Sequence, residues 1–159
     1  MTTEVRSTRL RRSISAPRER VYRLLLDPTA LPRWKVPDGM DLEVHEWEPR
    51  EGGSIRVSLT YRDVTAAGKS DVHTDTYHGR FVRLVPNELI VERDEFETDD
   101  PAFRGAMTIS IALHDAEGGT ELVATHDGVP AGVRLADNET GWRMALDKLA
   151  ALAQQPPAR

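Results

Sequence analysis

The segment 138–153 constrains the fold more than any other part of the sequence. Its apolar residues recur at three- and four-residue steps, and they are Trp142, Ala145, Leu146, Leu149, Leu152 and Ala153. This spacing places them on one face of an α-helix, and that face must be buried. Asp137 or Asn138 offers a side-chain oxygen to cap the first free N–H groups. No second helix of this length is evident, so we expect the apolar face to lie on a curved sheet.

Length and charge favour a single domain over residues 1–159. A chain of 159 residues can bury roughly two thirds of its unfolded surface and still enclose a pocket. The tail from about residue 154 contains two prolines and is expected to fray. The net charge of -5 and the scattered basic residues argue against binding to nucleic acid. The basic segment 6–12 includes the apolar Leu10, so we interpret it as a charged edge strand rather than a basic tail.

Metal ions and cofactors are not expected. The sequence has no cysteine, which excludes a disulfide framework and a thiolate metal site. The histidines show no paired spacing typical of zinc sites, and they are His45, His73, His78, His114 and His126. No glycine-rich phosphate loop is evident. No apolar run resembles a leader or reaches membrane length, so we expect a cytoplasmic protein that does not bind membranes.

Upstream of the terminal helix, the chain reads as one strand, two short helices and about six further strands. The first strand is expected at 7–15, a helix between Pro17 and Asp27, and a helical turn within 29–37. The later strands are expected at 41–47, 54–62, 72–85, 89–96, from Met107, and at 120–126. Gly79 marks a candidate bulge in one of them, and residues 63–71 form a connection.

Short motifs along nearly the whole chain carry a family resemblance. They are Ile14-Ser15-Ala16-Pro17-Arg18-Glu19-Arg20-Val21-Tyr22, Asp27-Pro28 followed by Trp34, Arg50-Glu51-Gly52-Gly53-Ser54-Ile55-Arg56, Gly79 with Pro86, Gly119-Thr120, His126-Asp127-Gly128-Val129-Pro130, and Gly141-Trp142 followed by Leu146 and Leu149. In this order they resemble bacterial homologues of the activator of heat-shock protein 90 ATPase, within the START-like (SRPBCC, birch-pollen-allergen-like) superfamily. The resemblance implies an α+β helix-grip fold. A curved antiparallel sheet of about seven strands would wrap around a long C-terminal helix, with two short helices after the first strand.

The resemblance also implies a deep cavity between the sheet and the C-terminal helix. The candidate ligand-binding residues are Trp34, Ile55, Val57, Leu59, Tyr61, Tyr77, Phe81, Met107, His126, Gly141 and Trp142. A tyrosine could orient a ligand by hydrogen bonding, and a glycine leaves room for it. The alternative is that the aromatic and methionine side chains simply fill a core. The resemblance favours the cavity.

Two sets of polar residues are candidates for chemistry. His126 is the candidate catalytic residue, because imidazole exchanges a proton near neutral pH. His73, Asp75 and Tyr77 alternate along one strand and could together hold a polar group of a ligand. From the sequence alone we favour simpler interpretations of both sets. His126 would be a hydrogen-bonded wall residue or a solvent-exposed one. The other three would be polar residues on a solvent-exposed face of a strand.

Three functions therefore remain open. The favoured one is non-catalytic binding of a small, mostly apolar molecule. The second is a polyketide cyclase- or dehydratase-like enzyme, because the superfamily includes such enzymes together with ligand carriers and proteins of unassigned activity. The third is a chaperone-interaction module, which the family's name implies. A homodimer is an alternative to a monomer.

Overall fold

A computed structural model describes residues 6–62 and 74–156 of the chain. In chain order the elements are β1 (Ser7–Ile14), α1 (Arg18–Leu26), α2 (Leu31–Trp34), β2 (Met40–Trp47), β3 (Ser54–Tyr61), β4 (Thr74–Val85), β5 (Leu89–Phe96), the 3-10 turn η1 (Pro101–Phe103), β6 (Met107–Ala116), β7 (Gly119–Asp127) and α3 (Leu135–Ala153). The predicted start of a strand at Val72, the connection 63–71 and the candidate residue His73 lie outside the described residues.

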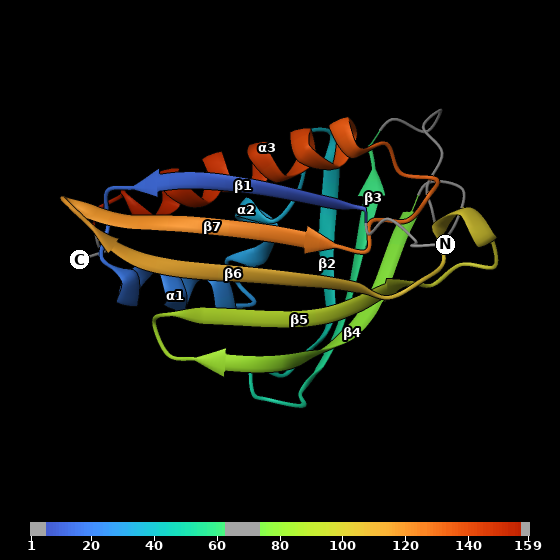
Figure 1. Cartoon of the computed structure of the whole chain (residues 1–159), viewed down its shortest axis with the longest axis horizontal. Coiled ribbons are helices and arrows are strands. Elements are labelled where there is room, and N and C mark those ends of the chain that lie inside the picture. The colour runs from blue at the N-terminus through green and yellow to red at the C-terminus, as the bar shows by residue number, and fades with distance from the viewer. Residues whose placement is uncertain (1–5, 63–73, 157–159) are drawn as a thin grey trace.

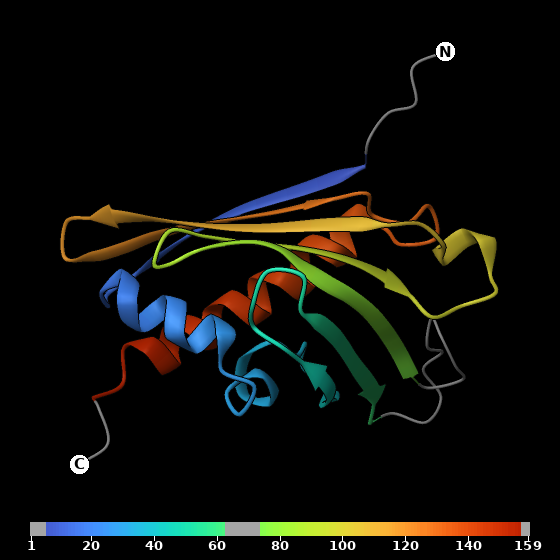
Figure 2. The same cartoon turned by 90° about the horizontal axis from the view of Figure 1, so that it is seen from below.

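The strands form one curled antiparallel sheet in the order β1-β7-β6-β5-β4-β3-β2 (Figure 1). All three helices lie on its concave side, where α3 runs along the sheet and α1 and α2 fill the remaining space (Figure 2). The predicted helix-grip fold is confirmed. Its core gathers apolar side chains from the inner faces of the strands and from the three helices.

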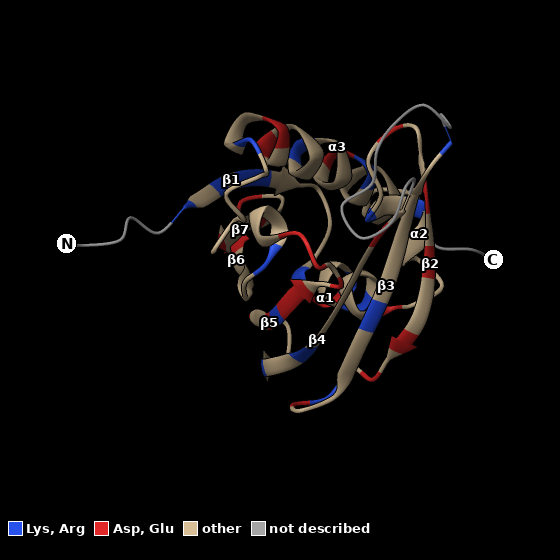
Figure 3. Ribbon diagram, turned by 90° about the vertical axis from the view of Figure 1, so that its right-hand side faces the viewer, with Lys and Arg blue, Asp and Glu red and all other residues tan. Residues whose placement is uncertain are grey.

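The Arg-rich N-terminal segment forms the edge strand β1, as predicted. Arg11 pairs with Glu121 of the neighbouring β7, and Arg12 pairs with Asp147 of α3. Positive and negative residues are interspersed over the strands and α3 (Figure 3). The basic residues of this segment therefore lie on an ordered edge whose charges are partly paired.

The terminal helix buries the predicted face but begins earlier than predicted. Its fully buried side chains include Leu146 and Leu149. The helix starts at Leu135 after the N-cap residue Arg134, which makes no side-chain capping bond. The prediction of a cap at Asp137 or Asn138 is therefore wrong. No helix in the described part of the chain is long and apolar enough to span a bilayer.

A β-bulge in β2 turns Trp47 into the core. The pairing of β2 with β3 shifts register between Val44 and Glu46, so His45 is the extra residue. An extra residue reverses the alternation of faces beyond it. Trp47 consequently points inward, where its ring packs edge-on against Phe81 at 5.0 Å and its indole N–H donates to the carbonyl of Leu26 at the end of α1.

Candidate functional site

A partly open cavity of about 820 Å³ lies between the inner face of the sheet and the N-terminal half of α3. Its apolar wall includes Leu59, Phe96, Met107 and Ile109 from the strands, and Gly141, Trp142 and Ala145 from α3. Ligand sites in proteins commonly have volumes of about 300–1,000 Å³ and mostly apolar walls with a few convergent polar groups. The cavity has this size, and its wall also carries polar side chains, among them Lys35 and the buried Asp75, Asp94 and His126.

The structure divides the predicted ligand-binding residues into two groups. Those on the cavity wall are Leu59, Tyr61, Tyr77, Met107, His126, Gly141 and Trp142. Those buried in the core instead are Trp34, Ile55, Val57 and Phe81. The inner face of β3 is thus shared, its first half facing the core and its second half the cavity. The reason is that Trp47, held against α1, covers the first half together with Phe81.

Asp75 belongs to the cavity rather than to a solvated face of the sheet. Its side chain is only 2% exposed, and it lies on the cavity wall together with Tyr77. The interpretation of Asp75 as a polar residue on a solvent-exposed face of the strand is therefore wrong. The companion residue His73 lies outside the described residues.

A charged pair lies at one wall of the cavity, with Lys35 on the wall and Glu92 behind it. The Lys35 Nζ lies 3.1 Å from the Glu92 Oε1, and both side chains are almost completely buried. Burial works to lower the pKa of Lys35, but the Glu92 carboxylate outweighs it and raises that pKa. Burial likewise works to raise the pKa of Glu92, and Lys35 outweighs it and lowers that pKa. Both groups are therefore ionised, as a pair.

Asp94, two residues along β5, lies directly opposite Gly79 of β4. A Cβ atom at position 79 would lie 2.1 Å from the Asp94 Oδ1 and 2.1 Å from the carbonyl oxygen of Arg93. Only glycine leaves space for this close approach. The predicted bulge at Gly79 is wrong, because the β4–β5 register shifts between Phe81 and Arg83 instead.

The surroundings of the Asp94 side chain favour its protonated, neutral form. It is 2% exposed, and no donor N–H or O–H group among the described residues reaches either of its oxygens. Its neighbour is the Glu92 carboxylate, and two carboxyl groups share a hydrogen bond only with a proton between them. Burial and the adjacent Glu92 raise the pKa of Asp94 well above its usual range. With Asp94 neutral, the cluster of Lys35, Glu92 and Asp94 carries no net charge.

His126 sits on the same wall in one defined tautomer. The indole N–H of Trp142 donates to its Nδ1 at 3.0 Å, and the Asn138 Nδ2 lies 3.3 Å from the same atom. Thr8 fixes Asn138 by donating to its Oδ1 at 2.5 Å. An indole can only donate, so Nδ1 is unprotonated and the proton of the neutral ring is on Nε2. The Nε2 is buried and has no partner among the described residues.

Burial lowers the pKa of His126 to about 4. The ring is therefore neutral at pH 7, and proton exchange near neutral pH, which the catalytic interpretation requires, is not expected of it. Its chemistry at this pH is that of a fixed N–H donor.

Acid should destabilise the protein through His126. The unfolded state binds a proton near pH 6.5 and the folded state only near pH 4, so the free energy of unfolding falls as pH falls through this window. The loss attributable to His126 should be roughly 3 kcal/mol. Asp94 acts in the opposite sense, because its folded-state pKa is raised and its contribution is lost as pH rises. We expect urea unfolding of His126→Phe between pH 7 and pH 4 to show a smaller loss than wild type; parallel profiles would contradict this assignment.

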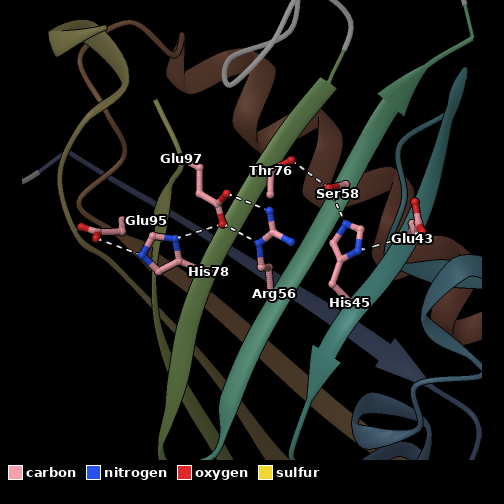
Figure 4. Close-up of polar contacts among 8 residues, drawn as sticks. All are labelled: Glu43, His45, Arg56, Ser58, Thr76, His78, Glu95 and Glu97. Carbon is pink, nitrogen blue, oxygen red and sulfur yellow. Dashed lines mark hydrogen bonds and ion pairs between the residues drawn. The ribbon is translucent and has the colours of Figure 1, made fainter. Parts of the chain in front are cut away.

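A second polar cluster lies on the opposite, outer face of the sheet (Figure 4). Arg56 of β3 holds Glu97 through two hydrogen bonds of 2.8 and 3.0 Å, and His78 of β4 lies between Glu97 and Glu95. Next to it, His45, Ser58 and Thr76 form a chain of 2.8 Å hydrogen bonds. These groups are engaged with one another across the strands. They stabilise strand pairing and leave the cavity as the candidate site.

Sequence reasoning missed Lys35, Glu92 and Asp94. The alternation in β5 contains a usable signal, because Ile90, Glu92 and Asp94 share a face while Val91 and Arg93 lie on the other. Two carboxylates on the apolar face of a central strand indicate an internal polar site. Lys35 has no comparable signal, since it follows a single helical turn whose orientation depends on tertiary packing.

Comparison with known proteins identifies the family. Residues 15–154 match the family described as Activator of Hsp90 ATPase homolog 1-like protein. The chain belongs to this family. No curated protein matches the chain.

Solved structures from bacteria share the fold of this family member. A Chromobacterium violaceum protein is 33% identical with a TM-score of 0.84, covering 94% of this chain and 98% of its own. A Rhodobacter sphaeroides protein is 22% identical with a TM-score of 0.76, over 94% and 97% of the two chains. An Arthrobacter aurescens protein is 18% identical with a TM-score of 0.76, over 94% and 87%. The last two show the fold alone.

Proposed function

We propose that the protein binds a small, mostly apolar ligand in the cavity between the sheet and α3. The observation that carries the proposal is the cavity of about 820 Å³, whose apolar wall is interrupted by a few buried polar groups. Burial of apolar ligand surface would drive binding, and the polar groups would orient the ligand. Native mass spectrometry of the purified protein is the direct way to find a co-purifying ligand.

Filling the cavity at Gly141 should abolish this binding. A Cβ at this position meets only the Pro37 Cγ at 3.8 Å, an ordinary contact, so Gly141→Ala should fold and bind normally. The larger Gly141→Leu side chain would occupy the space that the probe needs, so saturable binding should be lost. Glycine is a poor helix former, so neither substitution should disrupt α3. The measurement is fluorescence titration with the neutral apolar probe N-phenyl-1-naphthylamine.

The outcomes of this titration separate the candidates for the site. Saturable binding to wild type and Gly141→Ala, but not to folded Gly141→Leu, supports the cavity. Equal binding by all three proteins would place the site elsewhere. No saturable binding of chemically varied apolar probes to wild type would count against ligand binding altogether. Specific capture of a chaperone by the pure protein would then favour the interaction module that the family description suggests.

A cyclase- or dehydratase-like activity is the second candidate. The observation in its favour is that one cavity wall carries a carboxyl group with a raised pKa and an imidazole with a lowered pKa. A carboxyl group with a raised pKa is suited to act as a general acid, and the neutral His126 ring would hold the substrate through its N–H group. Turnover of an aromatic or polyketide-like compound by wild type, absent in His126→Ala, would support this candidate over simple binding.

A further inference from the structure

We propose that the cavity selects an apolar ligand with a neutral carbonyl group, whose oxygen accepts a hydrogen bond from the Nε2–H of His126. This inference rests on the proposed function, since it names the class of molecule that the cavity binds. Its basis is a single N–H group that the fold fixes on the cavity wall and leaves without a partner in the described part of the chain.

The position of the proton on His126 is set by α3. The indole N–H of Trp142 donates to Nδ1 at 3.0 Å, and the two rings meet edge to face with their centroids 6.1 Å apart. The Asn138 amide lies against the same nitrogen, and Thr8 of β1 fixes this amide by donating to its Oδ1. Nδ1 is therefore held as the acceptor, and Nε2 carries the proton. Because burial lowers the pKa of His126 to about 4, the ring keeps this single N–H group at pH 7.

The Nε2–H group belongs to the sheet side of the cavity. His126 is one of the buried, inward-facing residues of β7, and it lies on the cavity wall. The two nitrogens of an imidazole point in widely different directions, so with Nδ1 turned toward α3 the Nε2 is turned away from that helix. The register neighbour of His126 on β6 is Ile109, which also lies on the wall. A ligand can pack its apolar body on Ile109 while a polar substituent meets the N–H group.

A buried donor without an acceptor favours binding of a molecule that supplies one. Most buried side-chain donors in proteins have a partner, and one without carries the full cost of its lost hydration. The Glu92 carboxylate affects the pKa of His126, but it is paired with Lys35 at 3.1 Å and makes no hydrogen bond to Nε2. A ligand oxygen that reaches Nε2 would remove this cost. Binding would thus gain a hydrogen bond that the free protein does not make.

The chemistry of the N–H group selects the class of ligand. A carbonyl oxygen brings lone pairs and no donor, so it satisfies Nε2–H without needing a second partner. A hydroxyl oxygen can also accept, but its own proton then needs an acceptor. A carboxylate would add a negative charge that Lys35 does not neutralise, because the ammonium group is already paired with Glu92. A neutral ketone, aldehyde or ester on an apolar body fits best.

Two competitors of the same shape test the inference in wild type and in His126→Phe. They are 2-acetylnaphthalene and 2-isopropenylnaphthalene, in which a carbonyl oxygen and a methylene group occupy the same position, and each displaces N-phenyl-1-naphthylamine. We expect His126→Phe to weaken binding of the ketone about tenfold, the effect of losing one hydrogen bond at a buried site. Binding of the hydrocarbon should change by less than about twofold. Because the hydrocarbon reports any change in cavity shape, the difference between the two losses isolates the hydrogen bond.

Further variants assign the effect to the N–H group itself. The amide of His126→Gln can accept from Trp142 and donate to the ligand, so this variant should retain part of the ketone affinity. The matched control is Thr125→Phe, which places the same new ring on the outer face of β7 and should leave both competitors unchanged. If His126→Phe does not fold, proton NMR of wild type gives the test. The Nε2–H resonance of His126 should then move further downfield with the ketone than with the hydrocarbon.

Failure of this inference and failure of the proposed function give different results. If the probe and the hydrocarbon bind wild type, but the ketone loses no more affinity than the hydrocarbon in His126→Phe, the inference is overturned and the proposed function stands. An equal response of the Nε2–H resonance to both competitors has the same meaning. Tighter binding of 2-naphthoate than of the ketone would overturn the choice of a neutral carbonyl. If the probe does not bind wild type, or binds folded Gly141→Leu equally well, it is the proposed function that fails.

Discussion

Replacing Leu149 with aspartate should cost the protein about 3–5 kcal/mol of stability, the scale of an uncompensated buried charge. The Leu149 side chain is 0% exposed and belongs to the core cluster between α3 and the sheet. The carboxylate would lose its hydration there without gaining a partner. The midpoint of thermal unfolding should fall by roughly 6–20 °C, since each kcal/mol shifts it by about 2–4 °C in a chain of this size.

The control for this prediction lies two residues along the same helix. Ala151 is exposed, so Ala151→Asp adds the same carboxylate to α3 without burying it. Surface substitutions of this kind usually change stability by about 0.5 kcal/mol or less. If Leu149→Asp melted within about a degree of Ala151→Asp, the packing of α3 on the sheet would be contradicted.

The buried face of α3 was predictable from the sequence because a period near 3.6 residues has one structural solution. Its N-terminus was not. Asparagine is a residue type that often caps helices. The Asn138 amide, however, contacts Thr8 and His126, which are brought together by the β1–β7 pairing. Tertiary hydrogen bonds therefore override the local capping preference, and the helix extends back to Leu135.

The same distinction separates the predicted from the unpredicted parts of the candidate site. The alternation of apolar and polar residues in β3 places Leu59 and Tyr61 on its inner face, but it cannot show that this face is shared between core and cavity. That division depends on the bulge at His45, which turns Trp47 inward over one half of β3. The sequence also could not show why position 79 requires glycine, because the side chain that approaches it, Asp94, belongs to another strand.

The second substitution with a large expected effect on stability is at the Lys35–Glu92 pair. Replacing Lys35 with methionine keeps a similar apolar stem but leaves the Glu92 carboxylate buried without its 3.1 Å partner. Breaking a buried ion pair from one side typically costs about 3–5 kcal/mol. We expect Lys35→Met to lose stability on that scale at pH 7, measured as the free energy of unfolding in urea.

The double variant Lys35→Met/Glu92→Leu distinguishes an unpaired charge from lost packing. Replacing both members of a buried pair with apolar residues is often neutral or stabilising, so the double variant should recover most of the stability lost in Lys35→Met. Lowering the pH should also narrow the gap between Lys35→Met and wild type, because an unpaired buried carboxylate has a raised pKa and takes up a proton more readily in the folded state. If the double variant were no more stable than Lys35→Met, the loss would come from packing around position 35. The assignment of that loss to an unpaired Glu92 carboxylate would then be refuted.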